Sequence, residues 1–323
     1  PECPWPVNRQ TLAQHTQTWH IASMDHPDTN PAPFNRQTVR THRDRAAADF
    51  DQADFLFRES GNRLLDRLID VKRNFTTALD LGCHTGTLAK ALTAHPGIEH
   101  VVQCDLSTKM AHGAKSQNAQ MTLVCDEETL AFKDQSFDLV TSNLSLHWVN
   151  DLPGSLTQIR QILKPDGLFL ASFLGGNTLC ELRHAFMSAE LEIEAGASPR
   201  ISPFADVRDG GDLLSRAGFK LPVADVDTIT VNFETPFHLM HDLRAMGETN
   251  AVALGRKAFS RRQTMMEAIK RYPTAPGSGR IDASFQIIWL AAWAPGPNQP
   301  QPLKPGSATT HLGDHLGASS GDS

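Results

Sequence analysis

The segment Leu79-Asp80-Leu81-Gly82-Cys83-His84-Thr85-Gly86 carries the strongest structural signal in this chain. It lies where a short apolar run, typical of a buried strand, is followed by a helix-length run. Glycine at such a junction lets the backbone turn sharply and approach a ligand at the carboxyl edge of a parallel sheet. His84 stands where a dinucleotide-binding motif has its second glycine, so a diphosphate would be crowded while a smaller amino-acid group would fit. An ordinary strand-to-helix turn without a ligand is the alternative interpretation.

From residue 75 onward, short β-rich runs alternate with helix-length segments. Between the fourth and fifth runs, apolar residues from Leu152 to Leu163 recur at helical spacing, and Lys164-Pro165-Asp166-Gly167 is expected to end that helix with a turn. The alternation predicts an α/β fold with a mostly parallel sheet and helices on both faces. The expected strands are 78–80, 101–104, 122–125, 137–142, 168–173, 227–233 and 284–293.

Helical patterns flank this unit on both sides. Residues 24–73 are expected to form an N-terminal helical cap, because 42–50 is charged and rich in alanine and an apolar stripe runs from Leu64 to Ile69. Residues 74–294 are expected to form the main domain. Within it, helices are predicted over 179–194 and 212–217, and over most of 236–272.

The two ends of the chain differ from the rest. Residues 1–23 precede the first methionine, Met24, and are interpreted as an upstream segment that the native protein need not contain. Residues 295–323 are dominated by Pro, Gly, Ser, Gln and Asn without periodic apolar residues. Such a composition predicts a flexible tail.

Charge and cysteine content exclude several classes of protein. The 323 residues carry a formal charge of -6 at pH 7, so no overall positive field would recruit nucleic acid or an anionic membrane surface. The 5 cysteines contain no CxxC pair, and a chain of this size needs no disulfide framework, which favours a reducing compartment. No apolar run approaches the roughly 18 residues that span a bilayer. We therefore expect a protein without a transmembrane segment.

Acidic residues follow the second and third predicted strands. Asp105 ends the second strand, where a carboxylate can accept hydrogen bonds from both hydroxyls of a ribose. Asp126 and Glu127 follow the third strand, where a carboxylate and the adjacent backbone could meet the amine and ring nitrogens of adenine. Taken singly, Asp105 could be a helix N-terminal acid and the other two solvated loop acids. In register with the glycine turn, they favour a nucleoside ligand.

The run Ser142-Asn143-Leu144-Ser145-Leu146-His147-Trp148 follows the fourth strand. It places an amide, an imidazole and an indole at the sheet edge where open α/β folds bind ligands. The alternative is that Trp148 belongs to the core and that His147 is a structural hydrogen-bonding residue. We take Asn143, His147 and Trp148 as candidate catalytic residues.

These features together resemble the class I S-adenosylmethionine-dependent methyltransferases. The resemblance implies a Rossmann-like seven-stranded sheet with an N-terminal helical cap and helical insertions after strands 5 and 6. It implies that S-adenosylmethionine is the cofactor, with Asp105 on the ribose and Asp126 on the adenine. The cofactor-binding residues that it implies are Asp80, Gly82, Cys83, Gly86, Asp105, Leu106, Asp126, Glu127 and Asn143.

A closer resemblance covers most of the chain from about residue 43 to 313. The runs Ser145 to Pro153, Gly175 to Arg183, Ile201-Ser202-Pro203-Phe204 and Met246-Gly247-Glu248-Thr249-Asn250 resemble the respiratory complex I assembly factor 5 group. That group is in turn similar to the malonyl carrier-protein methyltransferase of biotin synthesis. Because several of these runs lie outside the cofactor loops, they are expected to shape a groove or cap for a protein substrate.

The resemblance implies a partner and two locations. The candidate substrate residues are Arg200, Phe204, Glu248 and Asn250. The implied partner is an iron–sulfur subunit of complex I or an acyl carrier protein, with peripheral association with a membrane complex. The implied location is a bacterial cytoplasm or the matrix side of the mitochondrial inner membrane.

Three functions are compatible with these residues. Methyl transfer to a protein-bound or carrier-bound carboxylate needs alignment and exclusion of water but no general base. Hydroxylation of an arginine, which the assembly factor group is associated with, needs an oxygen-activating centre, and no residue set has convincing metal-ligand spacing. The best metal candidate, His42-x-Asp44, is more simply explained as part of a polar helix face. A non-catalytic assembly chaperone is the third possibility.

Overall fold

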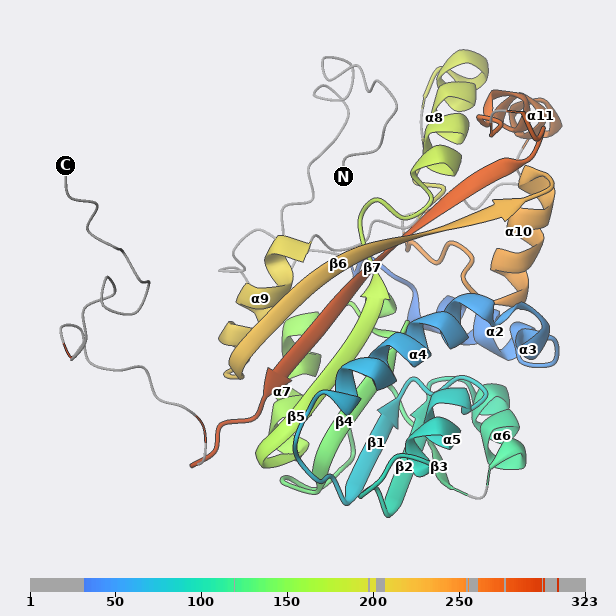
Figure 1. Cartoon of the computed structure of the whole chain (residues 1–323). Coiled ribbons are helices and arrows are strands. Elements are labelled where there is room, and N and C mark those ends of the chain that lie inside the picture. The colour runs from blue at the N-terminus through green and yellow to red at the C-terminus, as the bar shows by residue number, and fades with distance from the viewer. Residues whose placement is uncertain are drawn as a thin grey trace, which may run out of the picture.

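The computed structural model describes residues 32–297 apart from 119, 197, 202–206, 254, 256–260 and 276, together with residues 299 and 307. The upstream segment 1–23 and most of the predicted tail therefore lie outside the described residues. Seven strands form one sheet in the order β3-β2-β1-β4-β5-β7-β6 (Figure 1). They are β1 (Thr77–Leu81), β2 (His100–Asp105), β3 (Met121–Val124), β4 (Phe137–Asn143), β5 (Leu163–Leu174), β6 (Lys220–Phe233) and β7 (Ile281–Trp293).

Six strands run in the same direction, and the last one, β7, runs in the opposite direction. The neighbours among β1 to β5 pair in parallel, whereas β7 is antiparallel to both β5 and β6. The sheet of the class I methyltransferase type expected from the sequence is therefore confirmed. Because the parallel strands point the same way, their carboxyl ends share one edge.

Helices cover both faces of this sheet, as the strand patterns require. Alternate residues of one strand point to opposite faces, so Ala78 contributes to one apolar cluster and Leu79 to the other. The first cluster includes residues of α4 (Phe55–Ile69), α5 (Thr87–Thr93) and α6 (Thr108–Gln117). The second includes residues of α7 (Leu152–Ile162) and α9 (Val207–Arg216).

The structure corrects two local predictions about strands. The turn expected at Lys164 to Gly167 is an irregular start of β5, in which Phe137 pairs with Leu163 and Leu139 with Leu168. Asp166 has φ 60°, a left-handed conformation that absorbs the additional residues of β5. β6 begins at Lys220 and not at residue 227. The sequence did not reveal the first half of this strand, because that half is largely exposed and lacks the apolar alternation of a half-buried strand.

The N-terminal cap consists of α2 (Arg36–Ala46), α3 (Phe50–Ala53) and α4. Asn35 caps α2, since its side-chain oxygen accepts a hydrogen bond of 3.0 Å from the Thr38 amide. In Figure 1, α2 and α3 lie above the carboxyl ends of β1 and β2, and α4 crosses one face of the sheet. The cap therefore covers the edge at which this class of fold binds ligands.

The insertions expected after strands 5 and 6 are also present. α8 (Cys180–Glu194) and α9 separate β5 from β6, and α10 (Pro236–Ala245) and α11 (Arg262–Arg271) separate β6 from β7. The prediction of one largely helical segment over 236–272 was wrong in its middle. α10 ends at Ala245, and Gly247 with φ 78° directs the chain back toward α2.

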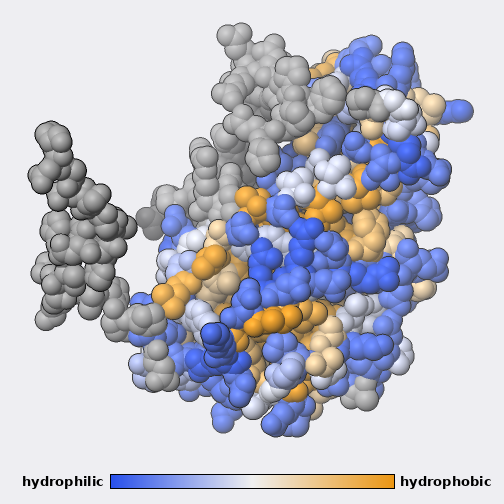
Figure 2. Space-filling model, in the orientation of Figure 1, coloured by the Kyte–Doolittle hydropathy of each residue, from blue (hydrophilic) through white to orange (hydrophobic). Residues whose placement is uncertain are grey.

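The face of the described part that Figure 2 shows is largely hydrophilic. Figure 2 shows hydrophobic patches among charged residues on one face, and Leu221 and Val223 of the edge strand β6 are exposed. None of the helices among the described residues is long and apolar enough to cross a membrane. The domain boundaries expected at residues 23, 73 and 294 stay predictions.

Candidate active site

Acidic and polar side chains meet where four parallel strands end. Asp80 belongs to β1, Asp105 is the last residue of β2, and Asn143 is the last residue of β4. Asp126 and Glu127 follow β3, and the Cys125 amide before them donates to the Asp105 carbonyl oxygen at 3.0 Å. The residues proposed from the sequence for the nucleoside site thus share the sheet edge beneath the cap.

The turn after β1 has the geometry that its glycines allow. The backbone amides of Gly82 and Cys83 donate to the Cys104 carbonyl oxygen at 2.8 and 2.9 Å, which ties the turn to β2. Gly82 and Gly86 have φ 74° and 85°, where other residues are strained. A Cβ at Gly86 would lie 2.8 Å from Asn118 Nδ2, so only glycine fits there.

His84, which replaces the second glycine of the dinucleotide motif, points its ring into the cap. Its φ is 49°, and its ring stacks on Phe50 at 5.2 Å and contacts Phe57 edge-on at 4.6 Å between centroids. Burial lowers the pKa of His84 to about 4, so the imidazole is neutral at pH 7. The crowding expected from this side chain is thereby partly avoided, because the ring faces aromatic cap residues.

Asp80 and Cys83 support the turn from within. Burial raises the pKa of the Asp80 carboxyl to about 7, and no hydrogen-bond partner of its Oδ2 is found in the described part of the chain. Burial likewise raises the pKa of the Cys83 thiol. The Cys83 thiol is therefore neutral at pH 7, whereas the Asp80 carboxyl changes its protonation near that pH.

Asp105 is fully buried and extensively hydrogen-bonded. It accepts bonds from the Ser107 amide at 2.7 Å and from the His84 amide at 3.1 Å. Its two carboxylate oxygens also lie 3.4 and 3.5 Å from Arg43 NH1. The next residue, Leu106, packs in an apolar cluster with Trp148.

Two arginines of α2 hold the acids at this edge, and the sequence analysis missed both. Arg43 NH1 donates to Glu127 Oε1 at 2.9 Å, and Arg36 pairs with both Glu127 and Asp126. Burial alone would raise the pKa of Glu127, but the charges of Arg43 and Arg36 lower it to about 2. The only sequence signal was the high charge of the cap, which does not reveal the partners.

Asn143 fastens the cap to the sheet. Its amide nitrogen donates to the Phe57 carbonyl oxygen of α4 at 2.8 Å, and its amide oxygen accepts from Ser172 at 2.8 Å. Ser60 of α4 donates to the same Ser172 hydroxyl at 2.9 Å. The structure thus gives the amide of this candidate catalytic residue a structural task.

His147 and Trp148 converge on one carboxylate. His147 Nε2 lies 2.9 Å from Glu248 Oε2, and Trp148 Nε1 donates to the same oxygen at 3.0 Å. Burial alone would raise the pKa of Glu248, but the charge and hydrogen bond of His147 and the charge of Arg43 lower it. Glu248 is therefore ionised at neutral pH, with its side chain 5% exposed.

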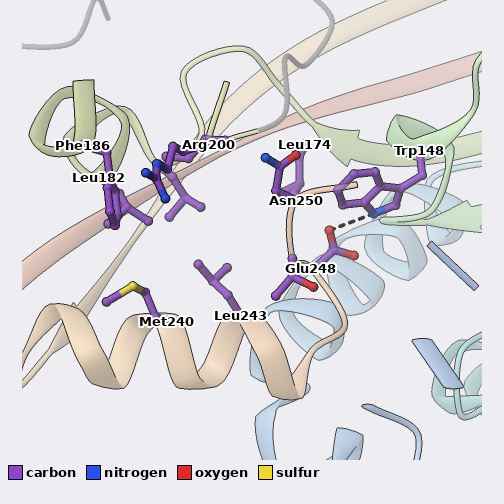
Figure 3. Close-up of a pocket in the computed structure, with 12 residues that line it drawn as sticks. Trp148, Leu174, Leu182, Phe186, Arg200, Met240, Leu243, Glu248 and Asn250 are labelled. Atoms are coloured by element: carbon purple, nitrogen blue, oxygen red, sulfur yellow. Dashed lines mark hydrogen bonds between the residues drawn. The ribbon is translucent and has the colours of Figure 1, made fainter. Parts of the chain in front are cut away.

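A cavity of about 240 Å³ lies beside this carboxylate. Figure 3 shows Leu182 and Phe186 of α8 facing Met240 and Leu243 of α10, with Glu248 and Trp148 at one end. The remaining lining residues are Leu174, Leu179, Arg200, Ile201, Thr249 and Asn250. The cavity is thus a mostly apolar chamber with charged groups at defined positions.

The other candidate substrate residues have different placements. Arg200 lines the chamber, where its guanidinium pairs with Glu190 at 2.6 Å and lies 5.4 Å from the centre of the Phe186 ring. Asn250 also lines it and donates to the Pro199 carbonyl oxygen at 2.7 Å. Phe204 lies outside the described residues.

The residues considered for a metal are used in other contacts. His42 Nδ1 lies 2.8 Å from the Thr249 hydroxyl, and Asp44 accepts a hydrogen bond of 2.5 Å from Ser107. Among the described residues, no group of three or more His, Cys, Asp and Glu side chains is arranged to hold a metal ion.

A Rossmann-like sheet with a glycine turn after β1 and acids after β2 and β3 defines the class I methyltransferase fold. The family described as methyltransferase domain matches residues 79–171. A Haloferax volcanii methyltransferase solved with the Trm112 activator is 22% identical with a TM-score of 0.50, over 81% of this chain and 100% of that one. The phosphoethanolamine N-methyltransferase 2 of Haemonchus contortus, solved with S-adenosylhomocysteine, is 20% identical with a TM-score of 0.50, over 80% of this chain and 60% of that one. These two structures show the shared fold.

Sequence relatives narrow the assignment. The human mitochondrial arginine-hydroxylase NDUFAF5 is 42% identical over 87% of this chain and 82% of its own length. The Danio rerio protein of the same name is 41% identical over 87% and 88%. The malonyl-[acyl-carrier protein] O-methyltransferase of Nitrosospira multiformis is 33% identical over 82% and 91%. The chain belongs to the NDUFAF5 family.

Proposed function

We propose that this protein is an S-adenosylmethionine-dependent enzyme that modifies an arginine side chain of a protein held in the chamber beside Trp148. The observation that carries the proposal is the ionised Glu248 carboxylate at one end of a mostly apolar chamber, whose other charged lining residue, Arg200, is paired with Glu190. The cofactor follows from the fold class and from the methyltransferase relatives.

The residues at the strand ends fit this cofactor. Gly82 and Gly86, both with positive φ, let the turn after β1 place backbone amides where the methionine end would bind. Asp105 would accept the ribose hydroxyls and Asp126 would face the adenine. The acids also suit a ligand that carries sulfonium and ammonium charges.

Replacing Asp105 tests the cofactor assignment. We expect Asp105→Asn to raise the Kd for S-adenosylmethionine at least tenfold, because charge-assisted hydrogen bonds contribute roughly 1.5–3 kcal/mol each. Calorimetric titration measures the change. Asp138→Asn is the matched control. Asp138 is bonded to Lys164 and lies at the amino end of β4, away from the carboxyl ends where the cofactor would bind, so this variant should keep the wild-type Kd. An Asp105→Asn protein that binds the cofactor as tightly as wild type would contradict the assignment.

The charge of the chamber favours a cationic acceptor. Glu248 presents a carboxylate, and Trp148 presents an aromatic ring beside it. A guanidinium group can donate to a carboxylate through its fork of N–H groups and stack on an aromatic ring. The apolar side chains of α8 and α10 would cover the methylene groups of the arginine and exclude water.

Two reactions are open at such an acceptor. Bound S-adenosylmethionine supplies an electrophilic methyl group, and transfer to nitrogen requires the acceptor to be aligned and to lose a proton. In that reaction Glu248 orients the guanidinium and accepts the proton that the nitrogen loses, with S-adenosylhomocysteine as the leaving group. Hydroxylation, which takes one oxygen atom from molecular oxygen and needs two electrons from an added reductant, is the second candidate, and it is favoured by the relatives at about 41% identity that are named arginine-hydroxylases.

A carboxylate acceptor is a further candidate. Arg200 at the chamber wall is the observation that favours it, together with the relatives named malonyl-[acyl-carrier protein] O-methyltransferases. The pairing of Arg200 with Glu190 weakens this alternative, because a substrate carboxylate would have to compete with Glu190. A non-catalytic chaperone would not need a chamber that binds an acceptor side chain.

The partner and location follow the relatives in the same way. We propose an iron–sulfur subunit of complex I as the protein substrate, with an acyl carrier protein as the alternative, and contact with a membrane complex only at its periphery. For a eukaryotic source, the names of the relatives favour mitochondria. For a bacterial source, the cytoplasm is the proposed location.

An intact-mass experiment tests the reaction. The purified protein is incubated with S-adenosylmethionine and either a complex I iron–sulfur subunit or malonyl carrier protein, with and without iron and reductant. A methyl-sized gain on an arginine supports methyl transfer, and a gain of one oxygen supports hydroxylation. A methyl-sized gain on malonyl carrier protein alone would overturn the arginine proposal, and no gain on either acceptor despite cofactor binding would favour the chaperone.

A further inference from the structure

We propose that α2 is an internal latch: its Arg43 guanidinium occupies the carboxylates that the cofactor requires, so that S-adenosylmethionine binds only when Arg43 withdraws. This inference rests on the proposed role of Asp105 as the ribose acceptor. It adds to that role a competition between the cofactor and a side chain of the same protein.

The Arg43 guanidinium lies on the carboxylates that the cofactor would contact. Its side chain is 1% exposed although it extends from the first long helix of the cap. One end nitrogen contacts Asp105 and Glu127, and the other donates to Ser145 Oγ at 2.8 Å. Ser145 in turn donates to Glu127 Oε1 at 2.6 Å, which closes the network.

This network and the cofactor cannot share the site. Both oxygens of Asp105 already accept backbone amides and face Arg43, so two ribose hydroxyls would have to displace the guanidinium. Ser145 Oγ lies 2.1 Å from the position that a Cβ on Gly82 would take, so the approach to the turn is filled as well. The cavity beside Gly82 measures about 20 Å³, against about 240 Å³ for the chamber beside Glu248, so it leaves no room for a nucleoside.

Displacement of Arg43 is electrostatically feasible because the ligand brings its own positive charge. A buried acid that loses its only cation is strongly destabilised. Glu127 keeps Arg36. The cofactor carries a sulfonium, an ammonium and a carboxylate, hence one net positive charge, and its neutral ribose hydroxyls would donate to Asp105 in place of Arg43. The exchange therefore substitutes one positive charge for another.

The latch is also connected to the acceptor chamber. A Cβ on Gly247 would lie 3.4 Å from the Cα of Arg43, so α2 packs closely on the segment that carries Glu248. His42 and Arg45 of α2 both bond to the Thr249 hydroxyl, at 2.8 and 3.3 Å. Movement of α2 on cofactor binding would therefore change the wall of the chamber, which couples the two sites.

Calorimetry with matched variants tests the latch. We expect Arg43→Met to lower the Kd for S-adenosylmethionine about tenfold, equivalent to ~1.4 kcal/mol, since the competing cation is removed. Arg40→Met is the control, because Arg40 lies on the same helix but bonds Thr108 and not the acids; its Kd should match wild type. Arg43→Lys is the substitute variant if Arg43→Met fails to fold. It keeps the charge but cannot bridge Glu127 and Ser145 together, so its Kd for S-adenosylmethionine should lie between those of wild type and Arg43→Met.

Hydrogen exchange provides the second readout. In wild type, saturating S-adenosylmethionine should speed amide exchange in α2, whereas a ligand that α2 clamps would slow it. Tighter binding by Arg43→Met with faster exchange supports the latch. Weaker binding by Arg43→Met with slower exchange would make Arg43 a cofactor ligand, and equal affinity would make it a structural residue. Either result overturns the latch but leaves the cofactor assignment intact. If neither wild type nor Arg43→Met binds S-adenosylmethionine, both the latch and the cofactor assignment are overturned.

Discussion

Glu248 carries the charge on which the proposed acceptor depends. We expect Glu248→Gln to raise the KM for an arginine-containing protein acceptor about tenfold, because a charge-assisted bond of roughly 1.5–3 kcal/mol is lost. The Kd for S-adenosylmethionine should change little, since the glutamine oxygen can still accept the bond from Trp148. Initial rates over a range of acceptor concentrations, with calorimetry for the cofactor, separate the two effects.

Glu181→Gln is the matched control for this prediction. Glu181 is a largely buried glutamate of α8 that bonds to Ser284 and does not line the chamber. Its replacement should leave the KM for the acceptor unchanged. A lower KM in Glu248→Gln would instead indicate a negatively charged acceptor and would contradict the arginine proposal.

At the scale of elements, the Asn143 amide is one of the bonds that hold the cap on the sheet. Asn143 at the end of β4 joins Phe57 of α4 to Ser172 of β5. We expect Asn143→Ala to lower the free energy of unfolding by about 1–3 kcal/mol, because two buried polar groups lose their partner. Urea denaturation measures this loss.

Asn143→Asp distinguishes the structural task from a catalytic one. A carboxylate can accept from Ser172 but cannot donate to the Phe57 carbonyl oxygen, so this variant should also be destabilised. Asn150→Ala is the control for the loss of any part-buried side-chain amide, because the Asn150 side-chain oxygen accepts a hydrogen bond from the Phe34 amide. Full stability of Asn143→Ala with loss of turnover would return Asn143 to the catalytic residues.

At the scale of the whole molecule, Asp80 makes stability depend on pH. Its folded pKa, about 7, lies above the unfolded value of about 3.9. Between these values the folded protein binds the proton that the unfolded chain releases, so the free energy of unfolding falls as pH rises from 4 to 7. Asp80→Asn removes this dependence, and its advantage over wild type should grow by roughly 2 kcal/mol from pH 5 to pH 8.

Asp138 provides a control of opposite sign. The bond from Lys164, together with those from Thr76 and Thr77, outweighs partial burial and lowers the pKa of Asp138. Its stabilisation is present above the unfolded pKa and is lost as the pH falls through the folded value. Urea denaturation of Asp138→Asn should therefore show a loss of stability at pH 7 that shrinks in acid. An Asp80→Asn protein whose advantage is independent of pH would contradict the burial argument.

Much of the fold could be predicted because strand and helix signals are local. The apolar runs that became β1, β2 and β4 are buried on both faces and bounded by Gly, Asp or Asn. The first half of β6 could not be predicted, because an exposed edge strand has no burial pattern to display. The resemblance to known families added the Rossmann-like arrangement of these strands.

The candidate site could be predicted only in part. Asp105 and Asp126 were placed correctly at one edge, since parallel strand ends must meet there. Arg36 and Arg43 could not be found, because their partners lie far along the chain; Asp126, for example, is 90 positions from Arg36. Local sequence patterns do not show which residues pair over such a separation.

The sequence by itself determined the alternation of strands and helices, the glycine turn and the order of the strand-end acids, since each depends on residues close together in the chain. Tertiary structure alone decided that Asn143 ties down α4, that His147 and Trp148 share Glu248, and that Arg43 lies on Asp105 and Glu127. The physical reason is that these contacts depend on how the cap and the 246–250 segment pack over the sheet edge, and burial there makes each unpaired polar group costly.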